Sequence, residues 1–369
     1  MTSSSSTPTK PVLILGNGFD LDLGLKTSYK SFYESKLCPK DYPSPLIAYL
    51  NRSFDGNLGF VKWYDLENEL FNYYNSRFKG VDIISDEERS FILRVFPKDM
   101  PSKAILPGDK YIYQTLKKKG IIQVTNRFVT IPYREDIINS TLCRDRISLK
   151  KIKDGLCSFM GEAGDASINY NSLAYCVLSL MVNYMKKRSG TLKVYSFNYT
   201  SLPAVNGENI KGNNVHGCCS KNNVIIGTGD EKIDPDYDFL QKSFDKTFSP
   251  PNIVDSLDSA DSIVIFGHSL GYNDKQYFKP FFTKQAGFGK TTRKRITIIT
   301  KDDDSVQEIK RSLQKMTDNN LSVLMSRNTV RFVKTDLIKT ESNSLMNFFR
   351  EYGVSKKEDR KRLLDSLYI

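Results

Sequence analysis

Short apolar runs, separated by polar and helical stretches, lie at both ends of this chain. The first run is Val12–Leu15, which leads directly into the turn Gly16-Asn17-Gly18. A short apolar run that ends in a glycine turn is typical of a parallel strand buried on both faces. Similar runs recur after residue 190, so the pattern predicts sheet strands near residues 12, 194, 225, 264, 297 and 331.

Apolar residues at helical spacing fill the intervals between these runs. Leu66, Leu70 and Tyr74 recur at such a spacing, and residues 170–188 combine one apolar side with a basic last turn. Further helices are predicted at residues 21–35 (interrupted at 24–28), 236–246, 274–284, 304–315, 344–352 and 355–367. Strands that alternate with helices predict an α/β fold: a Rossmann-like parallel sheet with helices on both faces.

The predicted sheet uses both ends of the sequence, which suggests a domain with an insertion. We expect a disordered N-terminus at residues 1–10 and a Rossmann-like nucleotide-binding domain made of residues 11–40 and 190–350. Residues 41–189 are then a mostly helical insertion, and residues 351–369 a basic C-terminal helix.

Composition narrows the class of protein. The chain has 369 residues, of which 39% are hydrophobic, enough to bury a large core. No apolar run is long enough to span a bilayer, and the Ser/Thr-rich start has no apolar signal segment, so we expect a cytoplasmic protein without membrane contact. The six cysteines form no CxxC pair, so reduced thiols and no metal site are expected.

The net charge of +12 favours ligands that carry phosphate. Basic residues are denser at 290–295 and 356–362. Solvated faces explain these two runs as well as nucleic-acid contact does, so nucleic acid is a weakly supported alternative partner.

In an open α/β sheet, ligands bind at the carboxyl ends of the strands. The chain has two histidines, His216 and His268, and both lie beside glycines at predicted strand ends. Histidine is the side chain best suited to proton transfer near neutral pH. The same rule selects a wider set of candidates: Gly16, Asn17, Gly18, Asn198, Gly227, Gly267, Ser269 and Asp302.

Three motifs resemble known sites and then depart from them. The segment Gly267-His268-Ser269-Leu270-Gly271 has the form of a hydrolase nucleophile elbow, but no histidine follows it to complete the triad in that order. Gly289-Lys290-Thr291 resembles the end of a P-loop, but Lys284 stands where the first glycine is required. Gly16-Asn17-Gly18 is not the dehydrogenase fingerprint, because residue 21 is leucine.

An ordered set of short motifs resembles the bacteriophage abortive-infection AbiH family over roughly residues 11–350. The set is Ile14–Leu21, Gly24–Tyr29, Trp63–Glu67, Phe197–Thr200, Val215–Gly217, and Gly267–Leu270 with Asp274. This resemblance implies a role in phage defence.

The same order of motifs is similar to a remote sirtuin-type nucleotide fold. That similarity implies that Asn198 and His216 are catalytic and that Thr27 lies in a cofactor loop. The implied ligand contacts are the turns at Gly16–Gly18, Gly227–Asp230 and Gly267–Ser269. The chain lacks a four-cysteine zinc module, so lysine deacetylation is not expected.

Hydrolysis of NAD at its N-glycosidic bond suits this set of residues. Asn198 would hold the ribose or the water, and His216 would take the proton. Asp20, or Asp65 with Glu67, would stabilise the cationic transition state, although helix capping also explains Asp65. Asp302 would accept from a ribose hydroxyl, and Ser269 would join the glycine turns in binding phosphate.

Two other functions stay open at this point. The chain could be a non-catalytic nucleotide sensor or interaction protein, or a nucleic-acid-directed effector that uses its basic surface. In each case we expect an unidentified phage trigger, and a homo-oligomer is compatible with the sequence.

Overall fold

The computed structural model describes residues 10–367 except for 43, 57–64, 80–101, 105–113, 115–122, 125–127, 131–135, 206–208, 231–232, 234, 288, 290 and 339–341. The N-terminus that we expected to be disordered lies outside these residues, apart from Lys10.

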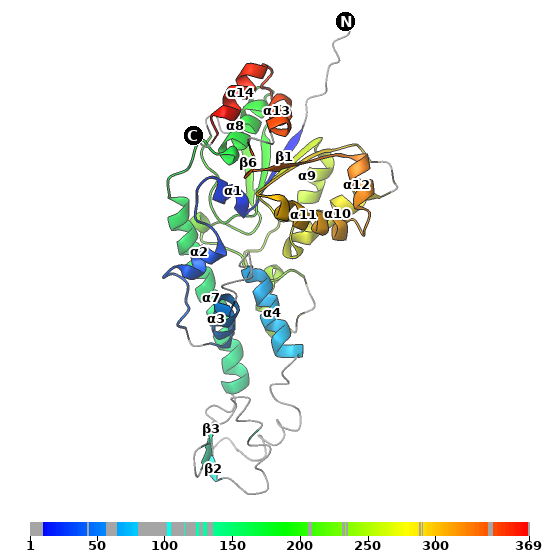
Figure 1. The fold of residues 1–369 in the computed structure, drawn as a ribbon. Coiled ribbons are helices and arrows are strands. Elements are labelled where there is room, and N and C mark those ends of the chain that lie inside the picture. The colour runs from blue at the N-terminus through cyan, green and yellow to red at the C-terminus, as the bar shows by residue number, and fades with distance from the viewer. Residues whose placement is uncertain are drawn as a thin grey trace.

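A six-stranded, fully parallel sheet forms the centre of the fold (Figure 1). Its order is β6-β5-β1-β7-β8-β9. Numbered along the chain, this is 3-2-1-4-5-6, the Rossmann order, so the predicted α/β fold is confirmed. The strands are β1 (Pro11–Leu15), β5 (Leu192–Ser196), β6 (Ile210–Asn214), β7 (Ser262–Phe266), β8 (Arg295–Thr300) and β9 (Thr329–Lys334).

One predicted strand is wrong. The apolar run Val224–Ile226 is not in the sheet, and the more polar segment Ile210–Asn214 forms the edge strand β6 instead. An edge strand pairs on one side only and does not need an apolar sequence. Val224 and Ile226 are apolar for another reason, because they are buried against the helices of the insertion.

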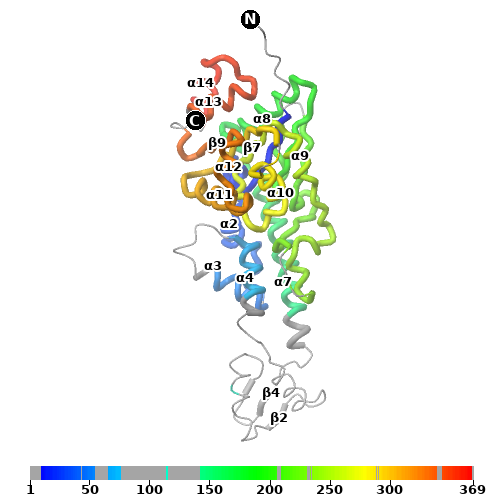
Figure 2. Tube along the Cα trace, turned by 90° about the vertical axis from the view of Figure 1, so that its right-hand side faces the viewer, coloured from blue at the N-terminus to red at the C-terminus, as the bar shows by residue number. Residues whose placement is uncertain are grey.

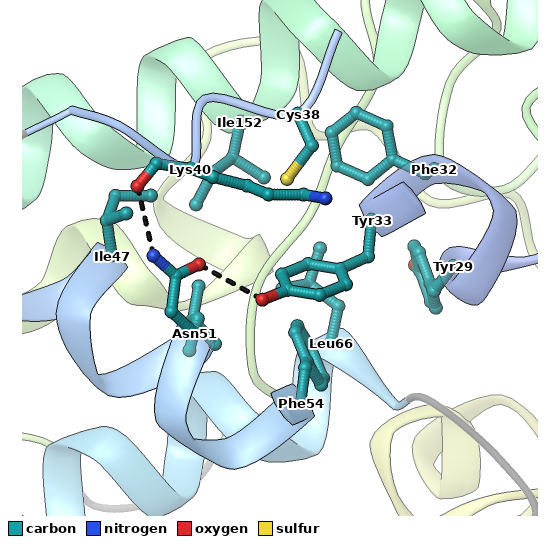
Figure 3. A pocket seen from close by; sticks show the side chains of 11 residues that line it. Tyr29, Phe32, Tyr33, Cys38, Lys40, Ile47, Asn51, Phe54, Leu66 and Ile152 are labelled. Carbon is teal, nitrogen blue, oxygen red and sulfur yellow. Dashed lines mark hydrogen bonds between the residues drawn. The ribbon is translucent and has the colours of Figure 1, made fainter. Parts of the chain in front are cut away.

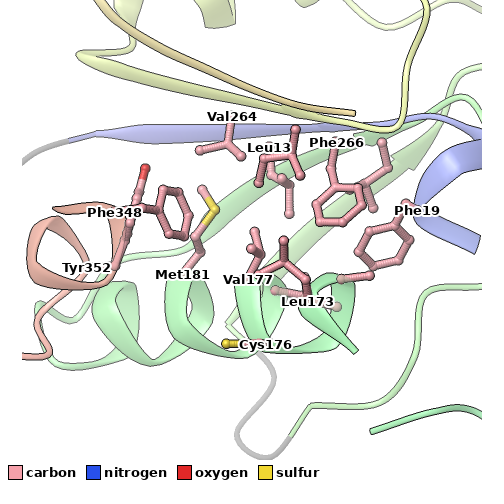
Figure 4. Packing of buried hydrophobic residues seen from close by; sticks show 14 of the residues in the cluster. Leu13, Phe19, Leu173, Cys176, Val177, Met181, Val264, Phe266, Phe348 and Tyr352 are labelled. Carbon is pink, nitrogen blue, oxygen red and sulfur yellow. The ribbon is translucent and has the colours of Figure 1, made fainter. Parts of the chain in front are cut away.

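Alternate residues of the central strands face the two helical layers. Leu13 and Leu15 point into a core with α8 (Leu173–Lys186) and α13 (Ser342–Glu351). Figure 4 shows Leu13 in this core, together with side chains of α8 and with Phe348 and Tyr352. Val12 and Ile14 face the opposite core. That core includes α9 (Ile253–Ser259), α10 (Lys275–Ala286), α11 (Asp303–Met316) and α12 (Leu321–Arg327). Helix α8 lies within the range expected for the insertion, yet it packs on the sheet.

The ends of the chain add short helices to this core. The predicted helix at 21–35, with its interruption, is present as α1 (Asn17–Asp22) and α2 (Tyr29–Glu34). The basic helix near the C-terminus is α14 (Lys357–Asp365). The helix predicted at 236–246 is instead two 3₁₀ segments, Pro235–Leu240 and Lys242–Phe244, because Thr228 pairs with Gln241 in a β-bridge between them.

The insertion extends away from the carboxyl ends of the strands (Figures 1 and 2). Its helices α3 (Pro45–Gly56), α4 (Leu66–Lys79) and α7 (Asp136–Gly164) form a third hydrophobic cluster with residues of the 224–240 segment. It also contains a small antiparallel sheet of β2 (Ser102–Ala104), β3 (Gln123–Val124) and β4 (Phe128–Thr130). The insertion is therefore packed over the edge at which ligands bind in this fold class.

Candidate functional site

The turns that follow β1 and β7 are in direct backbone contact. Gly18 N donates to Gly267 O at 2.9 Å, and a Cβ at Gly16 would lie 2.6 Å from that same oxygen. Gly267 has φ +63°, and a side chain there would meet Gly18 and Phe19 at 2.4 Å. These glycines are thus required by the close approach of two turns, at the point where the strand order reverses.

Three backbone amides of these turns, those of Gly16, Gly18 and Gly267, are already engaged. Gly16 N donates to Phe266 O at 2.9 Å and Gly267 N to Ile299 O at 2.8 Å, in addition to the bond from Gly18. Binding of a phosphate by these amides stays a prediction, and it requires that the ligand replace the carbonyl partners.

A buried carboxylate lies beside the turn of β1. Asp20, on α1, is 3% exposed and accepts hydrogen bonds from Asn198 Nδ2 and Thr200 Oγ1, both at 2.7 Å. Burial raises the pKa of Asp20 to about 6, although hydrogen bonds from Thr200 and Asn198 oppose the shift. Thr27 donates to Asn17 Oδ1 at 2.7 Å. The structure therefore brings together four of the predicted site residues and closes the 24–28 loop over them.

Both histidines of the chain meet a single carboxylate. Asp274, at the N-terminus of α10, has Oδ1 3.1 Å from His216 Nε2 and Oδ2 3.4 Å from His268 Nε2. His268 Nδ1 accepts from Leu270 N at 2.9 Å, so its proton lies on Nε2 and faces Asp274. The ring of Phe197 packs edge-on against both imidazoles, with centroids 5.2 and 4.3 Å away. The arrangement fixes the orientation of both rings.

A buried lysine completes the group formed by His216, His268 and Asp274. Lys242 is 1% exposed, and its Nζ lies 2.8 Å from Glu67 Oε2, 3.2 Å from Asp274 Oδ1 and 3.3 Å from His216 Nε2. Glu67 comes from α4 of the insertion, so the insertion supplies part of the group. Gly227 allows the lysine segment to approach, because a Cβ there would lie 2.4 Å from Leu240 O.

Burial and the Lys242 ammonium together determine which of the acidic and imidazole side chains in the group are ionised. Burial and the Lys242 ammonium both lower the pKa of His216, so its imidazole is neutral near pH 7. Burial opposes ionisation of Asp274, but Lys242 and His216 together hold its pKa well below the usual range. Burial raises the pKa of Glu67 to about 8, although Lys242 opposes the shift. A neutral histidine beside an ionised aspartate can accept a proton.

A pair of tyrosines leads from this group to a small pocket. Tyr199 OH lies 3.2 Å from Tyr29 OH. Tyr29 also lines the pocket shown in Figure 3, where Asn51 bonds to Tyr33 and to the carbonyl of Lys40. The pocket lies between α2, α3, α4 and α7, and its volume of about 20 Å³ has room for about one water molecule. It is too small for a nucleotide.

The other predicted residues lie apart from this group. Ser269 is exposed, and within the described part of the chain it has no hydrogen bond to either histidine. Asp302 caps α11 by accepting from Ser305 N at 2.9 Å. Asp65 caps α4 by accepting from Asn68 N at 3.0 Å, which agrees with the helix-capping role that the sequence also suggested. The geometry does not support a serine nucleophile.

Sequence reasoning missed three members of the site. Lys242 lies in a polar segment without periodicity, and its partners Glu67 and Asp274 are distant in the sequence. Asp274 stood in the AbiH-like motif set without a role, but its place at a predicted helix start beside a histidine motif was a usable signal. Thr200, next to the predicted Asn198, was also missed.

The described residues contain no group of three or more His, Cys, Asp or Glu side chains arranged to hold a metal ion. A membrane-crossing helix is likewise absent from the part of the chain that the structure describes.

The model of the bacteriophage abortive infection AbiH family matches residues 12–298. The chain belongs to this AbiH family. The matched range contains Asp20, Glu67, His216, Lys242 and Asp274, so the buried group is part of the AbiH region. Family membership implies a role in bacteriophage abortive infection. No curated protein and no solved structure gives a significant match to this AbiH chain.

Proposed function

We propose that this AbiH chain is an anti-phage effector that binds NAD or a related nucleotide and hydrolyses its N-glycosidic bond. The observation that carries the proposal is the meeting of both histidines on Asp274 at the carboxyl edge of a Rossmann-ordered sheet. In this fold class dinucleotides bind at the reversal of strand order, between β1 and β7.

The reaction needs one proton acceptor and one group that stabilises positive charge. The bond between ribose C1′ and the nicotinamide nitrogen breaks, and nicotinamide leaves as a neutral group with the electron pair. A water oxygen then bonds to C1′, and its proton passes to His216 Nδ1, the acceptor nitrogen of a neutral imidazole whose Nε2–H donates to Asp274. The neutral state of His216 and its orientation by Asp274 suit this step.

The buried carboxylate of Asp20 suits the second requirement. Once ionised, it would stabilise the cationic ribose, and Asn198, which donates to it, would position the ribose hydroxyl or the water. Asp20 and Asn198 are each less than 10% exposed, so the ligand must gain access by movement of the 24–28 loop. In the structure Thr27 of this loop donates a hydrogen bond to Asn17.

Residues at the rim would complete the ligand contacts. The exposed hydroxyl of Ser269 is available to a phosphate oxygen. The turns at Gly16–Gly18 and Gly267 would bind phosphate after exchanging their carbonyl partners. Asp302 would accept from a ribose hydroxyl in place of its bond from Ser305, and Gly227 would act indirectly by allowing the Lys242 segment to approach.

The test is incubation of the pure, full chain with NAD and quantification of the products by mass spectrometry. We expect free nicotinamide and ADP-ribose in equal amounts, with ADP-ribose showing that water is the acceptor. Absence of both products at stoichiometric protein, over hours, would contradict the proposal.

A nucleotide sensor without catalysis is the second candidate. The contact between the two glycine turns favours it, because a ligand that separates them would change the conformation of the site. Equilibrium dialysis with radiolabelled NAD separates the two functions: binding with unchanged NAD indicates a sensor, and binding with product formation indicates an enzyme.

A further inference from the structure

Three of the six cysteines converge on one turn directly after His216. Cys218 and Cys219 lie in this turn, and Cys157 reaches it from α7 of the insertion. The Cys157 thiol donates to Cys219 O at 3.5 Å and lies 3.5 Å from Asn222 Oδ1. The turn is thus held against the insertion by sulfur contacts.

The Cys218 thiol is surrounded by hydrogen-bond donors. Its Sγ lies 3.1 Å from Ser220 Oγ and 3.7 Å from Ser201 Oγ. Hydrogen bonds from Cys219 and from Ser220 lower the pKa of Cys218 to about 5, although burial opposes the shift. Cys218 is 3% exposed, but both serines are exposed, so the sulfur lies just beneath the surface. An oxidant would have to approach this thiol past the two exposed serines.

The neighbouring cysteines differ in environment. Burial and the Asp154 carboxylate raise the pKa of Cys157. Burial alone raises the pKa of Cys176 to about 12, as expected for an inert thiol within an apolar core. Cys143 is exposed and provides a reference for an unassisted thiol.

We propose that Cys218 is a peroxide-reactive thiol and that Cys157 is its resolving partner. The Cys218 sulfur attacks one oxygen of the peroxide, the O–O bond breaks, and hydroxide leaves, so the product is a sulfenic acid. The Cys157 sulfur then attacks the sulfenic sulfur, and the sulfenic oxygen leaves as water. The two thiols lose two electrons, which reduce the peroxide to water.

Cys219 is the less suitable resolving thiol despite its proximity. Adjacent Cα atoms are about 3.8 Å apart, below the range of about 4.4–6.8 Å that ordinary disulfides span. A bond between Cys157 and Cys218 would instead join α7 to the turn.

Such a bond would act on the site through the backbone. Cys219 N donates to Tyr199 O at 2.8 Å, and Ile225 N donates to His216 O at 2.8 Å. Only Gly217 separates Cys218 from His216 in the chain, and these two backbone hydrogen bonds hold the turn on either side. Oxidation would change the position of His216 relative to the insertion. The thiol site itself does not depend on the proposed nucleotide chemistry.

The experiment treats the full chain with one equivalent of hydrogen peroxide at pH 7, followed by dimedone labelling and peptide mass spectrometry. We expect wild-type protein to form a Cys157–Cys218 disulfide at least ten times faster than Cys143 is oxidised, because the serine hydroxyls around Cys218 stabilise its thiolate. In Cys157→Ser, dimedone should label Cys218. In the matched control Cys143→Ser, the disulfide should form at the wild-type rate.

Oxidation of Cys143 at the same rate as Cys218, or a disulfide with a different pairing, would overturn the proposal. If Cys157→Ser does not fold, as judged by circular dichroism, the decision rests on wild-type protein. Competitive alkylation at pH 6 should then modify Cys218 at least tenfold faster than Cys143, and equal rates would refute the assignment.

Discussion

At the scale of single residues, the buried Lys242 ammonium is the centre of the electrostatic account. Two carboxyl groups, of Glu67 and Asp274, lie within 3.2 Å of it, and the ionised Asp274 depends on it for charge compensation. Removing one partner of a buried ion pair costs far more than the pair contributes, because the remaining charges stay in a poorly solvated place.

We therefore expect Lys242→Met to lower the free energy of unfolding by about 3–5 kcal/mol in urea titrations. The matched control is Lys284→Met, which removes a lysine whose bond to Asp258 is 2.7 Å long but whose side chain is 56% exposed. Its loss should change stability by less than about 1 kcal/mol. Equal effects of the two substitutions would show that Lys242 is not a buried counter-ion.

Asp20 should make stability depend on pH. Its folded-state pKa of about 6 lies above the ordinary value of 3.8, so the folded protein holds this proton more tightly than the unfolded chain does. The resulting stabilisation is complete below about pH 4 and is lost as the pH rises to about 6, by roughly 3 kcal/mol.

Urea titrations of wild type and Asp20→Asn at pH 4 and pH 7 measure this effect. Relative to the variant, wild type should lose roughly 3 kcal/mol between the two pH values. A difference that does not change with pH would show that Asp20 ionises normally.

At the scale of elements, the two glycine turns determine how β1 and β7 end. We expect Gly16→Ala to lower the free energy of unfolding by about 1–3 kcal/mol or more, because its Cβ would lie 2.6 Å from Gly267 O and from His268 Cα. Gly161→Ala, on α7, meets nothing within 4 Å and should stabilise the protein by about 0.5–1 kcal/mol. Thermal unfolding of both variants measures the contrast; destabilisation by Gly161→Ala, or none by Gly16→Ala, would contradict it.

Most strands of the sheet could be predicted because β1, β7 and β8 are buried on both faces and rich in apolar residues, and within β5 Lys193 alone is exposed. The edge strand β6 could not, since Ile210–Asn214 has one pairing partner and a polar sequence. The apolar run Val224–Ile226 was wrongly predicted as a strand of the sheet. Its side chains are apolar because they contact the insertion.

At the scale of the whole molecule, the insertion and the sheet share the site. Local patterns located Asn198 and His268 because each follows an apolar run, and they located His216 because it lies beside a glycine at a predicted strand end. They could not show that Lys242 would be buried, since its partners Glu67 and Asp274 are 175 and 32 residues away in the chain. That information exists only in the tertiary arrangement.

Loosening the insertion should therefore loosen the Lys242 segment. Leu70→Ala, on α4, creates a cavity in the cluster that includes Val224 and Leu240, and should cost about 2–5 kcal/mol. Leu313→Ala, on α11, removes an equally buried leucine from the opposite core and should cost a similar amount. Hydrogen exchange at 224–242 should accelerate more in Leu70→Ala; equal acceleration in both would contradict the coupling.

The most direct measurement of the central claim is the rate of nicotinamide release from NAD by wild type, His216→Ala and Asn209→Ala. Asn209 precedes β6 at the opposite edge of the sheet, where its side chain donates to Gly190 O, so its variant is the matched control. We expect wild type and Asn209→Ala to release nicotinamide at equal rates, and His216→Ala to be slower by about 10²–10⁴. Unchanged release by a folded His216→Ala, or no release by wild type, would contradict the account.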